Sequence, residues 1–107
     1  MENFNKETLD IVYESNFLTL EEKTLVLLKK IEAYMIFADM KYINDPRNAN
    51  LRETIKDYMD EIVSLVVKIN DLEVKVIHND NESLMMKCEC KKAKLINILT
   101  HLEKKYL

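Results

Sequence analysis

The chain has 107 residues, a mass of 12.7 kDa and a net charge of −3, a size that suits one compact domain over residues 1–107. Hydrophobic residues make up 48% and charged residues 33%, so the composition is that of a folded rather than a disordered chain. The sequence has no glycine, which excludes glycine-based phosphate loops, dinucleotide fingerprints and nucleophile elbows. The net charge is too mild, and of the wrong sign, for a general nucleic-acid binder.

The N-terminal segment and the cysteines indicate the compartment. The segment MENFNKETLD lacks a basic region and an apolar run, so we expect no signal peptide. The longest purely apolar run, Ala33–Ala38, is far shorter than the roughly 20 residues that span a bilayer. Cys88 and Cys90 are too close in sequence to join distant segments by a disulfide. We therefore expect a cytoplasmic protein without a membrane partner.

Two helices are predicted in the first third of the chain. A short one runs from about Lys6 to Glu14, with Asn5 as its N-cap. After a turn around residues 15–19, the run Thr-Leu-Glu-Glu from Thr19 matches a capping box and predicts the start of a second helix.

The second predicted helix becomes apolar all round toward its end. Its apolar positions step by four and three as far as Ala38, and every side chain from 33 to 38 is apolar. A helix of this kind lies at the centre of a fold or is covered by a partner. Asp45 and Pro46 are predicted to end it, and the same pair suits the N-cap and first position of the next helix.

The third predicted helix carries the longest apolar pattern in the chain. Its positions alternate steps of four and three, as in a coiled-coil seam, which also suits antiparallel bundles. The residues at heptad position a are Ile55, Ile62, Ile69 and Val76, and those at d are Leu51, Tyr58, Leu65 and Leu72.

The same helix has a second apolar stripe, formed by Val63, Val67, Val74 and Ile77 at heptad positions b and f. Either this helix is sandwiched inside the bundle, or the stripe meets another molecule. Together with the apolar run of the second helix, the stripe defines the predicted partner or dimer interface. That interface consists of Val63, Val67, Val74, Ile77, Met35, Ile36 and Phe37.

The segment 71–91 allows two interpretations. Apolar and polar residues alternate on both sides of the polar run from His78 to Asn81, which is typical of a β-hairpin. The heptad pattern nevertheless continues into this segment, no glycine is present for a tight hairpin turn, and Asn79 with Glu82 resembles a capping box.

We therefore predict an all-α fold, a small antiparallel bundle of a short N-terminal helix and three longer ones. The last helix is expected to begin at about Lys91, or already at Glu82, and to end in Lys104 and Lys105. An α+β fold with a hairpin at about 71–91 is the alternative.

No constellation for catalysis or metal binding stands out. The metal candidate combines Cys88 and Cys90 with His78 and His101, but two cysteines at this spacing diverge on a helix and share a face only on a strand. The acidic row Glu53, Asp57, Asp60 and Glu61 is interpreted as a solvated helix face. We expect no enzyme activity, no catalytic residue, no metal and no cofactor.

The C-terminal segment is basic on an otherwise acidic chain. Residues 82–107 carry six lysines against three glutamates, and the main cluster is Lys87, Lys91, Lys92 and Lys94. The first interpretation is that this segment packs beside the acidic N-terminal part. The second is that it contacts phosphate or an acidic partner, which includes the alternative of a nucleic-acid-associated regulator.

The leading prediction is therefore a small non-enzymatic protein-interaction module, a regulator, inhibitor or adaptor that binds a partner protein through apolar helix faces. We also expect a homodimer. Asparagine, lysine and isoleucine are abundant, which is typical of an AT-rich genome. One form of the hypothesis is therefore a protein of a mobile element that inhibits a host or defence protein.

Overall fold

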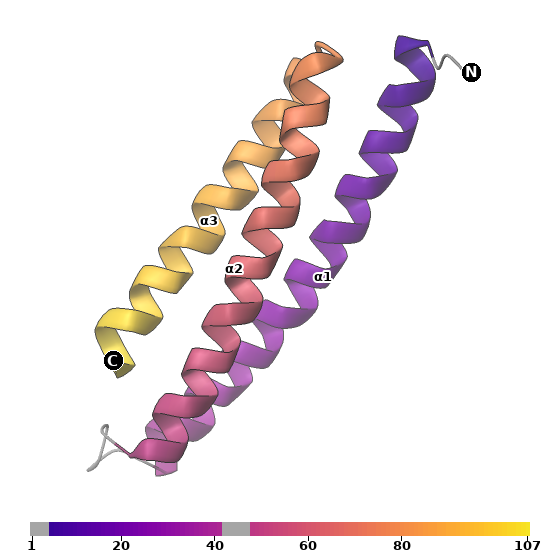
Figure 1. The fold of residues 1–107 in the computed structure, drawn as a ribbon. Helices are drawn as coiled ribbons and strands as arrows, with labels where there is room; N and C mark the ends of the chain where they lie inside the picture. Colours follow the sequence, from indigo (N-terminus) through magenta and orange to yellow (C-terminus); the bar gives the residue numbers. More distant parts are fainter. Residues whose placement is uncertain (1–4, 42–47) are drawn as a thin grey trace.

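The computed structural model describes residues 5–41 and 48–107, which form the helices α1 (Lys6–Lys41), α2 (Ala49–His78) and α3 (Glu82–Tyr106). The three helices lie lengthwise in an elongated molecule of 59 × 23 × 19 Å (Figure 1). Both α1 and α3 pack mainly on α2 and make far fewer contacts with each other. The described residues contain no strand, so the fold is all-α and bundle-like, and the alternative with a hairpin at 71–91 is wrong.

Helix α1 is continuous, which corrects the prediction of a short helix, a turn at 15–19 and a new helix from Thr19. The side chain of Thr19 does not cap a helix but donates to the carbonyl of Ser15 one turn earlier. The physical reason is that neither glycine nor proline interrupts this stretch. Phe17, in the middle of the stretch, is also buried, so the inward-facing side of the helix continues through it. The predicted cap is confirmed, because the Asn5 side chain accepts from the amide of Thr8 at 2.8 Å.

Helix α2 begins later than predicted. Asp45 and Pro46 lie outside the described residues, and the helix starts at Ala49 with Asn48 as its N-cap. The Asn48 side chain accepts from the amides of Asn50 and Leu51, which satisfies two donors of the first turn.

A three-residue turn joins α2 to α3. Asn79 ends α2, and Asn81, rather than the predicted Asn79, caps α3 by accepting from the amide of Leu84. Asp80 between them has a φ of 55°, a conformation that glycine usually supplies and that aspartate tolerates. Both asparagine side chains also donate to one carboxylate oxygen of Asp10, so the turn is held against the start of α1.

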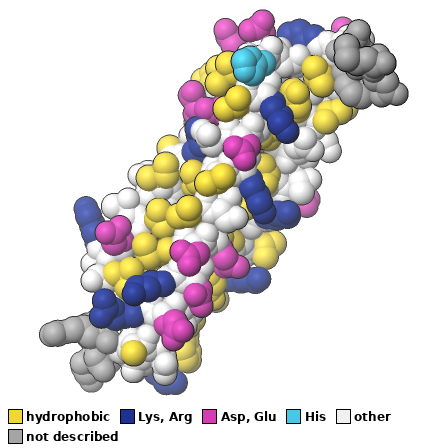
Figure 2. Space-filling view, viewed as in Figure 1, with side chains coloured by type: hydrophobic (Ala, Val, Ile, Leu, Met, Phe, Trp, Pro, Cys, Tyr) yellow, Lys and Arg dark blue, Asp and Glu magenta, His cyan; other side chains and the backbone are white. Residues whose placement is uncertain are grey.

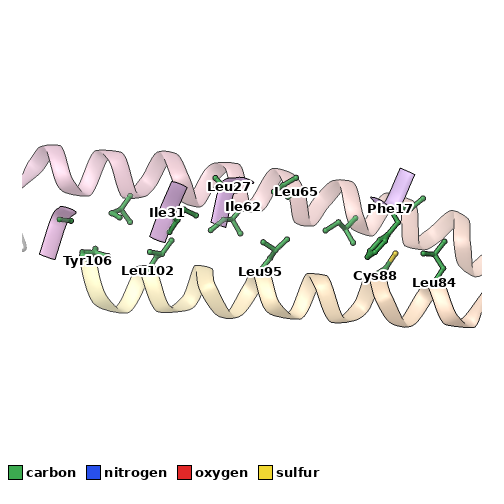
Figure 3. Packing of buried hydrophobic residues seen from close by; sticks show 14 of the residues in the cluster. Phe17, Leu27, Ile31, Ile62, Leu65, Leu84, Cys88, Leu95, Leu102 and Tyr106 are labelled. Atoms are coloured by element: carbon green, nitrogen blue, oxygen red, sulfur yellow. The ribbon is translucent and has the colours of Figure 1, made fainter. Parts of the chain in front are cut away.

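The core lies along α2, where the two flanking helices meet it. Seven of the eight residues at the predicted a and d positions are buried, and Tyr58 is half-buried. Figure 3 shows the side chains of Leu84, Leu95 and Leu102 pointing from α3 toward α2 along this seam. Helix α1 adds Phe17, Thr24, Ile31 and Ala38 at seven-residue spacing, with Leu27 between the second and third of them. The heptad prediction for α2 therefore identifies the residues that hold the fold together.

Candidate protein-interaction surfaces

An apolar stripe runs along the outer face of α2. Its valines Val63, Val67 and Val74 are 46%, 52% and 49% exposed, and Ile77 is 44% exposed. These positions lie away from the buried seam because b and f of a heptad point to the side opposite a and d. Figure 2 shows apolar side chains gathered midway along the molecule over α2 and α3, with acidic side chains nearer the start of α2.

The stripe contains a polar member that sequence reasoning missed. Asn70 occupies the step between Val67 and Val74, so the positions 63, 67, 70, 74 and 77 form an unbroken 4-3-4-3 series. The side chain of Asn70 accepts from Lys92 of α3 at 3.1 Å, which places this side of the series next to α3. We call these five residues the outer stripe. The spacing alone was sufficient to include Asn70.

A second apolar surface lies between α1 and α3, and we call it the α1–α3 groove. It has a volume of about 750 Å³ and is lined by residues of both helices. From α1 it takes Leu25, Leu28, Lys29, Ile31, Glu32, Met35, Ile36 and Asp39, and from α3 it takes Lys94, Asn97, Ile98 and His101. The structure thus places the predicted interface residues Met35 and Ile36 in a groove.

The residues of the predicted interface therefore lie on separate surfaces: some on the outer stripe, some in the α1–α3 groove, and Phe37 on neither. Phe37 is 47% exposed and does not line the groove; its ring contacts Tyr34 at 5.9 Å between centroids and lies below the Lys41 ammonium group. Sequence reasoning placed Met35, Ile36 and Phe37 in one interface, although successive residues on a helix point in different directions. It also missed the exposed Leu18 and Leu25, which a seven-residue spacing on α1 would have indicated.

The basic residues of α3 are largely paired within the chain. Lys87 pairs with Glu14 of α1 at 3.4 Å, and Lys91 pairs with Glu21 of α1 at the same distance. These contacts match the interpretation that the basic C-terminal segment packs beside the acidic N-terminal part. Lys94, in contrast, is exposed and forms no ion pair with any residue that the structure describes.

The ends of α1 and α3 are joined by another polar contact. Lys105 and the hydroxyl of Tyr106 both donate to the carboxylate of Asp39, at 3.0 and 3.1 Å. The hydrogen bond from Lys105 holds the pKa of Asp39 below its ordinary value of 3.8. The same contact raises the pKa of Lys105 above 10.5. This contact closes one end of the α1–α3 groove.

An ion pair lies at the α2–α3 contact, and no sequence signal had singled it out. Lys92 donates to Glu73 at 3.0 Å, and Glu73 is only 8% exposed. The second carboxylate oxygen of Glu73 has no hydrogen-bond partner among the described residues. Because both charges lose hydration on burial, a pair of this kind adds little net stability, whereas removing one partner leaves an uncompensated buried charge. Lys92 is thereby committed to the fold and is a poor candidate for contacting a ligand.

The two cysteines differ in their surroundings. Cys88 is fully buried and Cys90 is exposed, although they are two residues apart on α3. Burial, with Glu73 nearby, raises the pKa of Cys88 to about 11 from 9.0. Because the side chains diverge around a helix, they cannot bind one metal ion together. Among residues 5–41 and 48–107, no group of three or more His, Cys, Asp or Glu side chains is arranged to hold a metal.

The remaining polar candidates are exposed. Glu53, Asp57, Asp60 and Glu61 all lie on the solvent side of α2, as expected for a solvated acidic face. His78 and His101 are exposed as well, the first at the end of α2 and the second at the rim of the α1–α3 groove.

None of the helices in the described part of the chain is both long and apolar enough to cross a membrane. Comparisons with protein-family models, curated proteins and solved structures returned no match.

Proposed function

We propose that this chain is a non-enzymatic protein-interaction module, a regulator, inhibitor or adaptor that acts by covering part of another protein. The observation that carries this proposal is the apolar surface left over after the helices have packed. Two separate apolar surfaces remain open, the outer stripe of α2 and the α1–α3 groove. Contiguous exposed apolar surface on a small protein is typical of an interaction site.

For the outer stripe we propose a second copy of the chain as the occupant. The stripe has the same spacing as the buried seam on the other side of α2, and that spacing lets two helices interlock side chains along their length. One stripe can meet the same stripe on another copy, which gives a closed twofold contact. The side chains are valine and isoleucine around a single asparagine, Asn70, and residues of this kind are common in dimeric helical seams.

The stripe is only four turns long, so the dimer is expected to be weak and to form as concentration rises. The test is sedimentation equilibrium over a concentration series. The wild-type mass should rise from 12.7 kDa toward twice that value. The variant V63D/V67D should stay monomeric because it places two carboxylates in the contact.

The matched control is V12D/V26D, which adds the same two carboxylates at exposed valines of α1. It should dimerise like the wild type, and circular dichroism should show equal helix content in all three proteins. A wild type that is monomeric at every concentration, or a V63D/V67D variant that dimerises normally, contradicts self-association through the outer stripe.

A further inference from the structure

The α1–α3 groove is long enough to bind a helix of about four turns. The contact between Lys91 and Glu21 lies toward one end, and the contact between Lys105 and Asp39 lies at the other. From Leu25 to Asp39 the groove follows α1 for about 21 Å, or four helical turns, at a rise of 1.5 Å per residue. An amphipathic helix that docks in a groove uses anchors spread over such a length.

The groove is apolar at its base and on its α1 side. Ile31 is buried, and Leu28, Met35 and Ile98 are half-buried around it. Leu25 and Ile36 stand at the α1 rim and are 55% and 58% exposed. Both rim side chains have room to become buried when another apolar surface covers the groove, so the base and the α1 rim form one docking surface.

The α3 side of the groove carries one lysine, Lys94. Of its lining residues on α3, which are Lys94, Asn97, Ile98 and His101, none is acidic. A smaller hollow of about 220 Å³ also includes Lys94, and its other two lysines, Lys87 and Lys91, are paired with glutamates of α1. On the α1 side, Lys29 and Glu32 have opposite charges, and Asp39 is paired with Lys105 at 3.0 Å. With Asp39 balanced by Lys105 and Lys29 opposed by Glu32, the charge left unbalanced in the groove is that of Lys94, whose ammonium group has no ion-pair partner among the described residues. Lys94 therefore attracts a negative group.

We propose that the α1–α3 groove binds an amphipathic helix of a partner protein, with acidic side chains along the edge that faces α3. The apolar face of that helix packs on Leu28, Met35 and Ile98, and its acidic edge pairs with Lys94. This inference rests on the proposed function and adds the chemistry of the partner. A helix in this position would contact both α1 and α3, and it would complete a four-helix arrangement around the core.

The test uses a displayed library of amphipathic helices of about four turns, in which the apolar stripe is retained and the edge positions vary in charge. Helices enriched on the wild-type protein should carry Asp or Glu along one edge. Their affinity should fall by about tenfold or more on I36D, which places a carboxylate at the apolar rim, and on K94E, which reverses the charge of the α3 side.

Two controls match these variants. V26D changes an equally exposed residue of α1, and K68E reverses an exposed lysine of α2; both residues lie in the separate hollow between α1 and α2. Both controls should bind the selected helices as the wild type does. Because Ile36 and Lys94 are exposed, circular dichroism should show that all four variants fold.

The groove assignment is overturned if no helix is enriched, if the enriched helices lack an acidic edge, or if I36D and K94E bind them as well as the wild type does. It is also overturned if the groove instead binds a DNA or RNA duplex probe in a manner that K94E abolishes. Loss of binding in V63D/V67D alone would move the site to the outer stripe and leave the proposed function intact. If the wild type is monomeric but still binds the selected helices, self-association through the outer stripe is contradicted and the groove assignment is retained.

Discussion

Helix α2 presents two apolar faces with the same spacing and opposite environments. On the inner face, Ile62 and Ile69 are fully buried against α1 and α3. On the outer face, Val63 and Val67 follow the same steps of four and three, yet about half of each side chain is exposed. A periodic pattern therefore predicts a helix and its faces, whereas burial depends on whether another element is available to cover each face. In the described part of the chain, α1 and α3 cover one face of α2 and leave the other exposed.

The largest effect should come from truncating the inner face. Ile69→Ala removes a fully buried side chain and should lower the free energy of unfolding by about 2–5 kcal/mol. Val67→Ala on the outer face should change it by about 0.5 kcal/mol or less in the monomer. Urea denaturation of dilute protein measures both. Equal losses would show that the outer face is covered within a single chain.

The two cysteines of α3 offer a second comparison between a buried position, Cys88, and an exposed one, Cys90. Because burial raises the pKa of Cys88 from 9.0 to about 11, its thiolate fraction near neutral pH is about a hundredfold below that of an ordinary thiol. A thiol reagent should therefore label exposed Cys90 rapidly and leave Cys88 unmodified until the protein unfolds. C90S should give no fast phase and C88S a full one. Two fast phases in the native wild type would contradict the burial of Cys88.

A third prediction concerns the ion pair beside the inner face. Lys92→Met leaves the carboxylate of Glu73 buried without its partner and should cost about 2 kcal/mol of unfolding free energy. The double variant E73M/K92M removes both charges and should recover most of that loss. Chemical denaturation tests the comparison between the single and double variants. A double variant no more stable than K92M would show that packing, rather than charge, is lost.

The smallest effect is the pH dependence that arises from Asp39. Its pKa is lowered in the folded state, so its contribution to stability is complete above 3.8, the ordinary value, and is lost as the pH falls through the lower folded value. The melting temperature of the wild type should fall over this acidic range. In D39N that part of the decrease should be absent. An unchanged acid profile in D39N would contradict the contact among Asp39, Lys105 and Tyr106.

The elements that sequence reasoning predicted well depend on residues close together in the chain. The seam of α2 and the cap by Asn5 follow from periodicity and local capping chemistry. Periodicity placed Val63 and Val67 on a separate face of α2, but it left open whether that face is buried in the bundle or exposed. The false turn at 15–19 arose because Thr19 and Glu22 satisfy a capping pattern that tertiary packing around Phe17 overrides. The pairing of Lys92 with Glu73 was not predictable, because it depends on the register between two helices rather than on either sequence alone.

The α1–α3 groove was only partly predictable for the same reason. Met35 and Ile36 were singled out by their apolar surroundings in the sequence, but Ile98 and Lys94 come from a helix some sixty residues later. Their position depends on how α1 and α3 pack against α2. The basic character of α3 was evident from composition, whereas the pairing of Lys87 and Lys91 with α1, and the lack of such a pair at Lys94, required the structure.

The most direct test of whether a second copy covers the outer stripe of α2 is a disulfide cross-link at the centre of that stripe. Asn70 lies midway along the outer stripe, so an in-register pairing of two copies brings the two Asn70 positions together whether the helices run parallel or antiparallel. In the variant N70C/C90S, mild oxidation should give a covalent dimer rapidly, and adding V63D/V67D should suppress it. A chain that stays monomeric, or that cross-links equally well with V63D/V67D present, would contradict the proposal that a second copy covers this face.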